Sequence, residues 1–183
     1  IEGNSYNISH GSFWQSHKNA PKILIKKLME FANFKLGDRV CDLYGGVGLF
    51  TAPILKKIGD NGEIHLIESN SSCINDAKKI FENKKNVIIH HGKVEQKLGG
   101  IKSIDAIIMD PPRTGATKQV INQIIEKKAR FIIYISCDPA SLARDTKILL
   151  ENSYSLDKII GLDLFPMTHH IECMASFTIK EGK

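Results

Sequence analysis

One cysteine and one glutamate have the surroundings of residues that take part in covalent chemistry. Cys137 follows an apolar, β-branched run, Phe131-Ile132-Ile133-Tyr134, which predicts a buried strand. Asp138 and Pro139 come next, and these residue types favour the N-cap and the first turn of a helix. A thiol beside a helix N-terminus lies near the positive end of the helix dipole, which favours the thiolate. This spacing is typical of a nucleophile, whereas a free cysteine is otherwise most often a small buried apolar residue.

The glutamate is Glu172, which has apolar neighbours near the start of a predicted final strand, 170–179. A carboxylate is costly to bury unless it is paired or used, so we expect Glu172 to belong to a functional site. The nearby His169, His170 and Cys173 are residue types that bind metals. Because neighbours along a strand point to opposite faces, they cannot all reach one ion, and we expect no metal site.

A strand, a glycine-rich turn and a helix follow one another early in the chain. They are predicted at residues 40–44, at Gly45-Gly46-Val47-Gly48 and at residues 49–58. Glycines let the backbone approach a ligand closely and present N–H groups at the start of a helix. A second strand, 63–67, leads to Glu68, which lies 20 residues after Gly48. A carboxylate at that place is suited to receive the hydroxyl pair of a ribose.

The glycine pattern also narrows the class of cofactor. It reads Asp42-x-x-x-Gly46-x-Gly48, which is not the complete GxGxxG of dinucleotide sites, and no lysine follows it as in a phosphate-binding loop. Asp42 and Glu68 beside such a turn indicate a cofactor with one ribose and no pyrophosphate. S-adenosylmethionine meets these constraints better than a dinucleotide or ATP does.

A rigid loop follows a predicted fourth strand, 104–109. It begins Asp110-Pro111-Pro112-Arg113, and its two prolines have no backbone N–H to offer a neighbouring strand, so the sheet must end there. Ligands bind at the carboxyl edge of the strands in open α/β sheets. Asp110 and Arg113 are therefore candidate site residues.

The remaining pattern alternates strands with helices, which is typical of a doubly wound, mostly parallel sheet. The further helices are expected near residues 19–32, 73–84, 118–128 and 139–152, and the further strands at 86–91, 131–136 and 156–165. We expect helices on both faces and an antiparallel last strand. Residues 1–38 are predicted to be a lead-in segment and helix that pack on a domain formed by residues 39–183. The aromatic residues Phe13 and Trp14 of this segment are expected in the core.

Composition limits the class of protein. A chain of 183 residues with 42% apolar and 25% charged residues predicts one globular α/β domain. The 25 basic residues exceed the 20 acidic ones, which gives modest support for a polyanionic partner. Four cysteines without CxxC spacing argue against a zinc or iron–sulfur site and favour reduced thiols in a cytosol-like compartment. No apolar run has the length of a membrane span, and the first residue, Ile1, predicts a part of a longer protein.

Taken together, the motifs resemble the RNA (uracil-5-)-methyltransferase family. The matching pieces, in family order, are Phe13-Trp14-Gln15, Asp42-Leu43-Tyr44-Gly45-Gly46-Val47-Gly48-Leu49-Phe50, Asp110-Pro111-Pro112-Arg113-Thr114-Gly115, Ser136-Cys137-Asp138-Pro139 with Leu142-Ala143-Arg144-Asp145, and Phe165-Pro166-Met167-Thr168-His169-His170-Ile171-Glu172. The resemblance implies four residues that contact S-adenosylmethionine, a nucleophile and a general base. These are, in that order, Gln15, Tyr44, Glu68 and Asp110, then Cys137, then Glu172.

The resemblance further implies a Rossmann-like class I S-adenosylmethionine-dependent methyltransferase fold. Its expected activity is methyl transfer to C5 of a uridine in tRNA or rRNA, in the cytoplasm, through a covalent bond between Cys137 and C6 of the base. The family usually carries an N-terminal RNA-binding β-barrel, often with an iron–sulfur cysteine cluster. Neither is present here, so we expect an RNA-binding domain to be missing from this chain.

Three positions depart from the family pattern. His17 replaces an expected asparagine, Gly45 a frequent cysteine, and Lys93 lies near a frequent acidic position. Two other functions stay open. One is an amino-group methyltransferase, because an Asp-Pro-Pro loop also resembles sites that hold an exocyclic amine, and the other is a cofactor-binding domain without activity alone.

Overall fold

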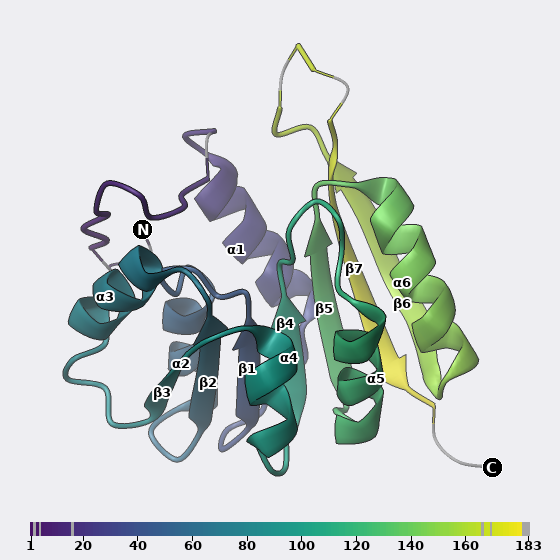
Figure 1. The fold of residues 1–183 in the computed structure, drawn as a ribbon, viewed down its shortest axis with the longest axis horizontal. Coiled ribbons are helices and arrows are strands. Elements are labelled where there is room, and N and C mark those ends of the chain that lie inside the picture. Colours follow the sequence, from purple (N-terminus) through teal and green to yellow (C-terminus); the bar gives the residue numbers. More distant parts are fainter. Residues whose placement is uncertain (2, 4, 16, 166, 169, 181–183) are drawn as a thin grey trace.

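A seven-stranded sheet runs through the computed structural model, which describes residues 1–183 except 2, 4, 16, 166, 169 and 181–183 (Figure 1). Its strands are β1 (Arg39–Leu43), β2 (Glu63–Glu68), β3 (Val87–His91), β4 (Ala106–Met109), β5 (Phe131–Ser136), β6 (Tyr154–Leu162) and β7 (Glu172–Ile179). Their order in the sheet is β3-β2-β1-β4-β5-β7-β6. The first five strands pair in parallel, and β7 is antiparallel to both of its neighbours. The predicted mostly parallel sheet with an antiparallel last strand is confirmed.

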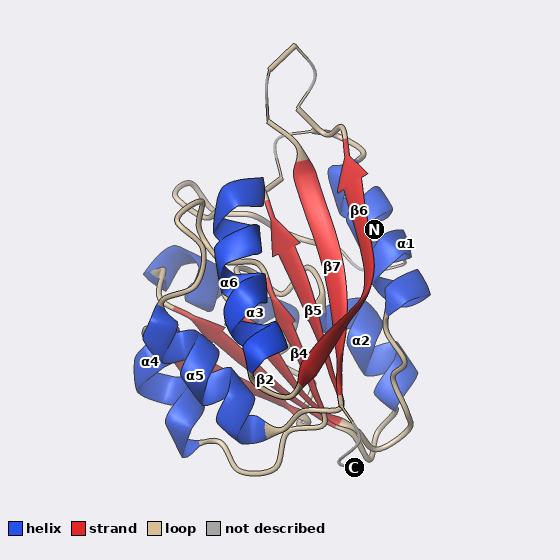
Figure 2. Cartoon of the chain, turned by 90° about the vertical axis from the view of Figure 1, so that its right-hand side faces the viewer, coloured by secondary structure: helices blue, strands red, loops and turns tan. Residues whose placement is uncertain are grey.

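Helices cover both faces of this sheet (Figure 2). They are α1 (Ala20–Phe31), α2 (Thr51–Ile58), α3 (Ser71–Ile80), α4 (Val94–Lys97), α5 (Lys118–Lys127) and α6 (Pro139–Glu151), with a 3₁₀ turn at Leu98–Gly100. The first three pack on one face and the last three on the other, so the sheet is doubly wound as expected. Among the described residues, no helix has the length and apolar character needed to cross a bilayer.

The central strands form the core because their residues are buried on both faces. Every residue of β4 and β5 is buried, and neither strand alternates between apolar and polar positions. Ile107 and Ile132 pack under α5, whereas Ile108 and Ile133 pack under α1. Such continuous apolar runs are typical of parallel strands between two helical layers. The loops that follow the strands consequently start from rigid positions.

Hydrogen bonds tie the segment before α1 to α3. Asp76, on α3, accepts hydrogen bonds from the Ser9 backbone N–H at 2.8 Å, the Ser9 hydroxyl at 2.6 Å and the Ser12 hydroxyl at 2.8 Å. Tyr6 packs against Trp14, with ring centroids 5.3 Å apart. These contacts bring the residues around Trp14 to the carboxyl edge of the parallel strands.

Some element boundaries differ from the sequence-based predictions. The predicted helix 73–84 begins at Ser71, because the Asn70 side chain caps it by accepting from the Ser72 and Cys73 N–H groups. The predicted strand 156–165 is Tyr154–Leu162, and the predicted strand 170–179 begins at Glu172. The short helix α4 was not predicted, since four residues carry too little periodicity. Pro166 and His169, in the last of the family motifs, lie outside the described residues.

Candidate active site

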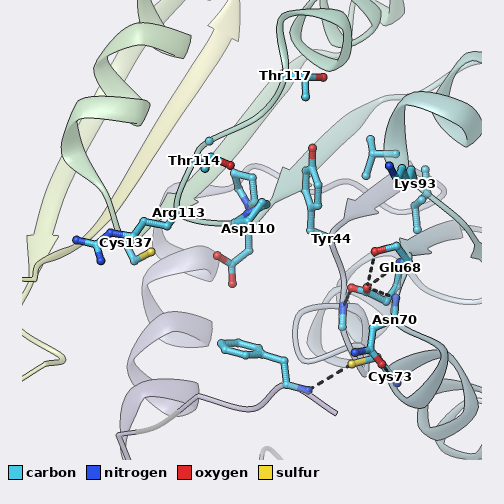
Figure 3. A pocket seen from close by; sticks show the side chains of 18 of the residues that line it. Tyr44, Glu68, Asn70, Cys73, Lys93, Asp110, Arg113, Thr114, Thr117 and Cys137 are labelled. Atoms are coloured by element: carbon cyan, nitrogen blue, oxygen red, sulfur yellow. Dashed lines mark hydrogen bonds between the residues drawn. The ribbon is translucent and has the colours of Figure 1, made fainter. Parts of the chain in front are cut away.

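The six residues expected to bind the cofactor or carry the chemistry line one cavity of about 690 Å³ at the carboxyl edge of the sheet (Figure 3). They are Gln15, Tyr44, Glu68, Asp110, Cys137 and Glu172. They come from the segment before α1 and from the ends of β1, β2, β4, β5 and the start of β7. The fold therefore brings together residues that are up to 157 positions apart in the sequence.

Glu68, at the end of β2, is held by three backbone N–H groups. Its Oε2 accepts from Gly46 at 3.0 Å, and its Oε1 accepts from Ser69 at 2.7 Å and from Asn70 at 2.6 Å. Gly46 has a φ of 56°, in the left-handed region that favours glycine. The glycine turn thus fixes the carboxylate at the cavity wall, and two oxygens with further lone pairs can accept a ribose diol.

Asp42 has a different place from the one expected. It is absent from the cavity wall and is buried beneath the turn, where its Oδ2 accepts from the Thr51 hydroxyl at 2.6 Å. Burial raises the pKa of this carboxyl to about 7, although the hydrogen bonds from Thr51 act in the opposite direction. Asp42 therefore joins β1 to α2 and packs beneath the glycine turn.

Tyr44 and Asp110 form the cavity wall beyond Glu68. Tyr44 has a φ of 59°, which is unusual for a residue with a bulky side chain, and Figure 3 shows its ring between Asp110 and Glu68. Asp110 follows β4, and its backbone N–H donates to the Leu43 carbonyl at 3.3 Å. Burial, and then the nearby Glu172 and Asp42, hold the pKa of the Asp110 carboxyl well above its usual range.

Glu172 is buried as its sequence context predicted. Its side chain is 3% exposed, and among the described residues its Oε1 has no hydrogen-bond partner. Burial raises the pKa of the carboxyl to about 7. A carboxyl of this pKa can accept or release a proton near neutrality, so the unpartnered oxygen has the properties of a general base.

Cys137 lies at the junction of β5 and α6, as predicted. Asp138 caps the helix by accepting from the Ser141 N–H at 2.7 Å, and Pro139 is in its first turn. Of the four cysteines, Cys137 alone is half-buried, and the other three are buried. Its thiol is therefore the one most accessible to a substrate in the cavity.

The ionisation of the Cys137 thiol differs from the expectation. Burial raises its pKa, and the acidic groups of Glu172 and Asp110 raise it further, whereas its own backbone N–H and the Arg113 charge lower it. The predicted preference for the thiolate is therefore wrong, because desolvation and two nearby acids outweigh the backbone N–H and Arg113. Arg113, which lies near Cys137 in Figure 3, is the cationic side chain that opposes them.

Several lining residues were missed by sequence reasoning. They include Phe13, Asn70, Cys73, Lys93, Thr114, Thr117 and Phe165. Phe13 was expected in the core, but it is 64% exposed and borders the cavity. Asn70 had a usable signal, because it is an N-cap residue two positions after Glu68 in the same loop. Within the described part of the chain, no group of three or more His, Cys, Asp or Glu side chains has the geometry of a metal site.

Comparison with known families agrees with this geometry. A family model described as "tRNA (Uracil-5-)-methyltransferase" matches residues 96–179, which include both Cys137 and Glu172. A second model, "Methyltransferase small domain", matches residues 10–133, which include the glycine turn and Glu68. The chain belongs to the RNA (uracil-5-)-methyltransferase family. The family expected from the motifs is thus confirmed.

Members of this family and solved structures resemble nearly the whole chain. An "Uncharacterized RNA methyltransferase" of Streptomyces avermitilis is 41% identical over 95% of this chain and 41% of its own length. A "23S rRNA (uracil(1939)-C(5))-methyltransferase RlmD" of Shewanella is 33% identical over 96% of this chain and 39% of its own length. The Pyrococcus abyssi tRNA (uracil-54, C5)-methyltransferase, solved with S-adenosyl-L-homocysteine, superposes with a TM-score of 0.81 at 29% identity. That superposition covers 96% of this chain and 42% of the Pyrococcus chain.

Two facts follow for this member of the family. Its fold is that of S-adenosylmethionine-dependent methyltransferases, as predicted. It spans about two fifths of the length of the relatives that it matches.

Proposed function

We propose that this chain transfers a methyl group from S-adenosylmethionine to C5 of a uridine in tRNA or rRNA. The observation that carries the proposal is the meeting of Cys137, Glu172 and Glu68 in one cavity. We also propose that residues 39–183 form the catalytic domain, that residues 1–38 pack on it, and that an N-terminal RNA-binding domain, absent from this chain, works with it in the cytoplasm.

The residues present fit S-adenosylmethionine. Glu68, held by backbone N–H groups, would accept the ribose hydroxyls, and Tyr44 and Gln15 would contact the cofactor from the same wall. Asp110, whose carboxyl has a raised pKa in a cavity with a second acid, would lie near the positively charged part of the cofactor. When bound, S-adenosylmethionine supplies an electrophilic methyl group.

The chain's own residues would make C5 reactive. C5 of uracil is a poor nucleophile, so the Cys137 thiolate would first form a bond to C6, and the electrons of the C5–C6 double bond would move toward C5. After methylation C5 carries both a methyl group and a hydrogen. Glu172 would accept that proton, the C5–C6 double bond would form again, and the bond between C6 and sulfur would break with the thiolate as leaving group.

The cavity implies how the base must be presented. A uridine inside a helix cannot reach a thiol at a sheet edge, so the substrate is an unpaired or extruded nucleotide. Arg113 and surface lysines would contact phosphates. The printed names of the relatives include both a 23S rRNA and a tRNA enzyme, which supports an RNA substrate and leaves both RNA classes as candidates.

The test uses RNA in which uridine is replaced by 5-fluorouridine. Fluorine at C5 blocks the proton removal assigned to Glu172, so we expect a covalent protein–RNA adduct that maps to Cys137 by mass spectrometry in the presence of S-adenosylmethionine. The Cys137→Ala variant should bind the cofactor normally and form no adduct. A methylated amine in the product, with no methyl group on a ring carbon, would instead support the amino-group alternative.

A further inference from the structure

The loop between β4 and α5, residues 110–117, forms part of the cavity wall and must be held in place. Asp110 and Arg113 both line the cavity, and the prolines between them cannot donate backbone hydrogen bonds. The loop extends beyond the last residue of β4, where the ladder ends. Asp110 at its start is held by a backbone hydrogen bond to Leu43, and the part of the loop near Ala116 is anchored by side chains of other elements.

That anchor is Asp145, a buried residue on α6. Its side chain is 1% exposed, and its Oδ2 accepts from the Ala116 backbone N–H at 2.9 Å and from the Tyr134 hydroxyl at 2.8 Å. Its Oδ1 accepts from Arg144 Nε at 2.8 Å and forms an ion pair with Arg144 Nη2 at 2.7 Å. The buried carboxylate is thus bonded on both oxygens, as a buried charge requires.

Arg144 extends the anchor to the loop backbone. Its Nη2 donates to the Thr114 carbonyl at 3.0 Å and to the Ala116 carbonyl at 3.1 Å. Gly115 lies between them with a φ of 76°, and a Cβ atom there would stand 2.5 Å from Arg144 Nη2 and 2.8 Å from Asp145 Oδ2. The loop therefore approaches this pair as closely as a glycine backbone allows.

We propose that Arg144 and Asp145 are positioning residues, which clamp the 110–117 loop to α6 so that Arg113 stands beside Cys137. The proposal deepens the proposed function, on which it rests, because it concerns residues of the same site. It assigns a role to the Leu142-Ala143-Arg144-Asp145 motif, which the chemistry of the nucleophile and the base leaves unexplained.

The connectivity explains why a clamp at this place acts on the nucleophile. Tyr134 belongs to β5, which ends immediately before Cys137, and α6 begins two residues after it. The clamp thus joins the loop to the same strand and helix that hold the thiol. The positive charge of Arg113 lowers the pKa of the Cys137 thiol, against burial and two nearby acids. Loss of the clamp would displace the part of the loop from Arg113 to Ala116 and take that charge away from the thiol, whereas Asp110 stays in place because its backbone N–H donates to the Leu43 carbonyl at the end of β1.

The experiment measures the rate at which iodoacetamide alkylates Cys137, as a function of pH, by mass spectrometry. Asp145→Asn preserves the side-chain volume, but its NH₂ must replace an oxygen that accepts either from the Ala116 N–H or from Arg144, neither of which can accept a hydrogen bond, so part of the clamp is lost. We expect alkylation at pH 7.5 to slow about threefold to tenfold, as for a rise in the thiol pKa of roughly half to one unit. Arg113→Ala should slow it by a similar factor, and the double variant should be no slower than Arg113→Ala.

Controls separate positioning from simple stability. Lys147→Ala removes an exposed ion pair with Glu151 on the same helix and should leave the alkylation profile unchanged. Arg144→Lys keeps the positive charge but cannot reach both loop carbonyls, so it should give an intermediate slowing even if Asp145→Asn does not fold. Two results would overturn the proposal. One is a folded Arg144→Lys or Asp145→Asn variant whose alkylation profile equals that of the wild type. The other is a double variant in which the two reductions in alkylation rate multiply.

This assay is independent of the proposed reaction. It needs neither RNA nor cofactor, so a chain that fails to methylate uridine still reports whether the clamp controls the thiol. Conversely, a chain that forms the 5-fluorouridine adduct but shows no clamp effect supports the proposed function and rejects the clamp.

Discussion

Cys137 and Glu172 line the same cavity, just beyond the last residue pair of the β5–β7 ladder. Ser136 pairs with Cys173 in the antiparallel register, and Cys137 and Glu172 each lie one residue further toward the cavity. Directly opposed residues in antiparallel strands have neighbouring side chains on the same face. A slip of one residue in β7 would turn Glu172 to the other face, so the strand register itself sets the meeting of thiol and carboxyl.

This arrangement predicts that removal of the base stops the reaction after the covalent step. Glu172→Gln should still bind cofactor and form the bond between Cys137 and C6 of unmodified uridine, because neither step needs the carboxylate. Turnover should fall by about 10²–10⁴-fold, the usual contribution of a general base. Gel electrophoresis of protein with labelled RNA would show an adduct that accumulates with unmodified RNA. Rapid turnover without an adduct would assign the proton removal to another group.

The burial of Glu172 also predicts how stability depends on pH. Its pKa rises from 4.5 to about 7 on folding, so between these values the folded state binds more protons than the unfolded state. Stability contributed by this group is therefore greatest at low pH and falls as the pH rises from about 4.5 to about 7. The free energy of unfolding of Glu172→Gln should equal that of the wild type near pH 4.5 and exceed it at pH 8, by at most about 3 kcal/mol. Urea unfolding of the variant and the wild type at both pH values measures their free energies of unfolding. The same difference between the two proteins at both pH values would contradict the raised pKa of Glu172.

The sequence predicted the parts of the site that depend on single elements. A β-branched run before Cys137 and a helix cap after it are local signals, and both elements form where they were expected. The same holds for the strand that leads to Glu68. Local signals are reliable here because both strands contain β-branched residues and a helix N-cap, Asn70 or Asp138, follows each within two residues.

Interactions between elements were beyond the reach of the sequence. The Asp145 bond to Ala116 joins residues 29 positions apart, and neither residue type indicates the other. The direction of the Cys137 pKa depends on Asp110 and Glu172, which only the sheet order places near the thiol. Phe13 was misplaced because an aromatic residue is usually buried, whereas this one borders a cavity.

The role proposed for Glu68 predicts a loss of cofactor affinity in a variant of similar shape. Glu68→Gln has one acceptor oxygen in place of two, and its amide NH₂ would face the Gly46, Ser69 or Asn70 N–H groups. Hydrogen bonds to a charged acceptor contribute about 1.5–3 kcal/mol each, so affinity for S-adenosyl-L-homocysteine should fall at least tenfold.

Isothermal titration calorimetry would measure this affinity. The exposed Glu126→Gln, on α5, removes one negative charge away from the cavity and controls for net charge. Equal affinities for both variants and the wild type would remove Glu68 from the cofactor site.

Gly48 gives a prediction that separates backbone strain from packing. Its φ is 90°, and a Cβ atom would lie 2.3 Å from Cε2 of Phe81, a ring at the end of α3. Gly37 is a matched control, because its φ is 84° and nothing lies within 4 Å of a Cβ atom there. Gly37→Ala should therefore cost about 1 kcal/mol of strain, whereas Gly48→Ala adds overpacking of about 1–3 kcal/mol.

A smaller side chain at position 81 should relieve the overpacking caused by Gly48→Ala but not the backbone strain. Phe81→Leu in the Gly48→Ala background should reduce the added cost, because the ring that collides with the new methyl group is gone, and the backbone strain should persist. Thermal and urea unfolding of the two single variants and the pair complete the cycle. If Gly48→Ala costs no more than Gly37→Ala, Phe81 does not restrict the turn. A larger loss of unfolding free energy in Gly48→Ala would mean that the Phe81 ring restricts the turn at Gly48. The same turn contains Gly46, whose N–H donates to Glu68.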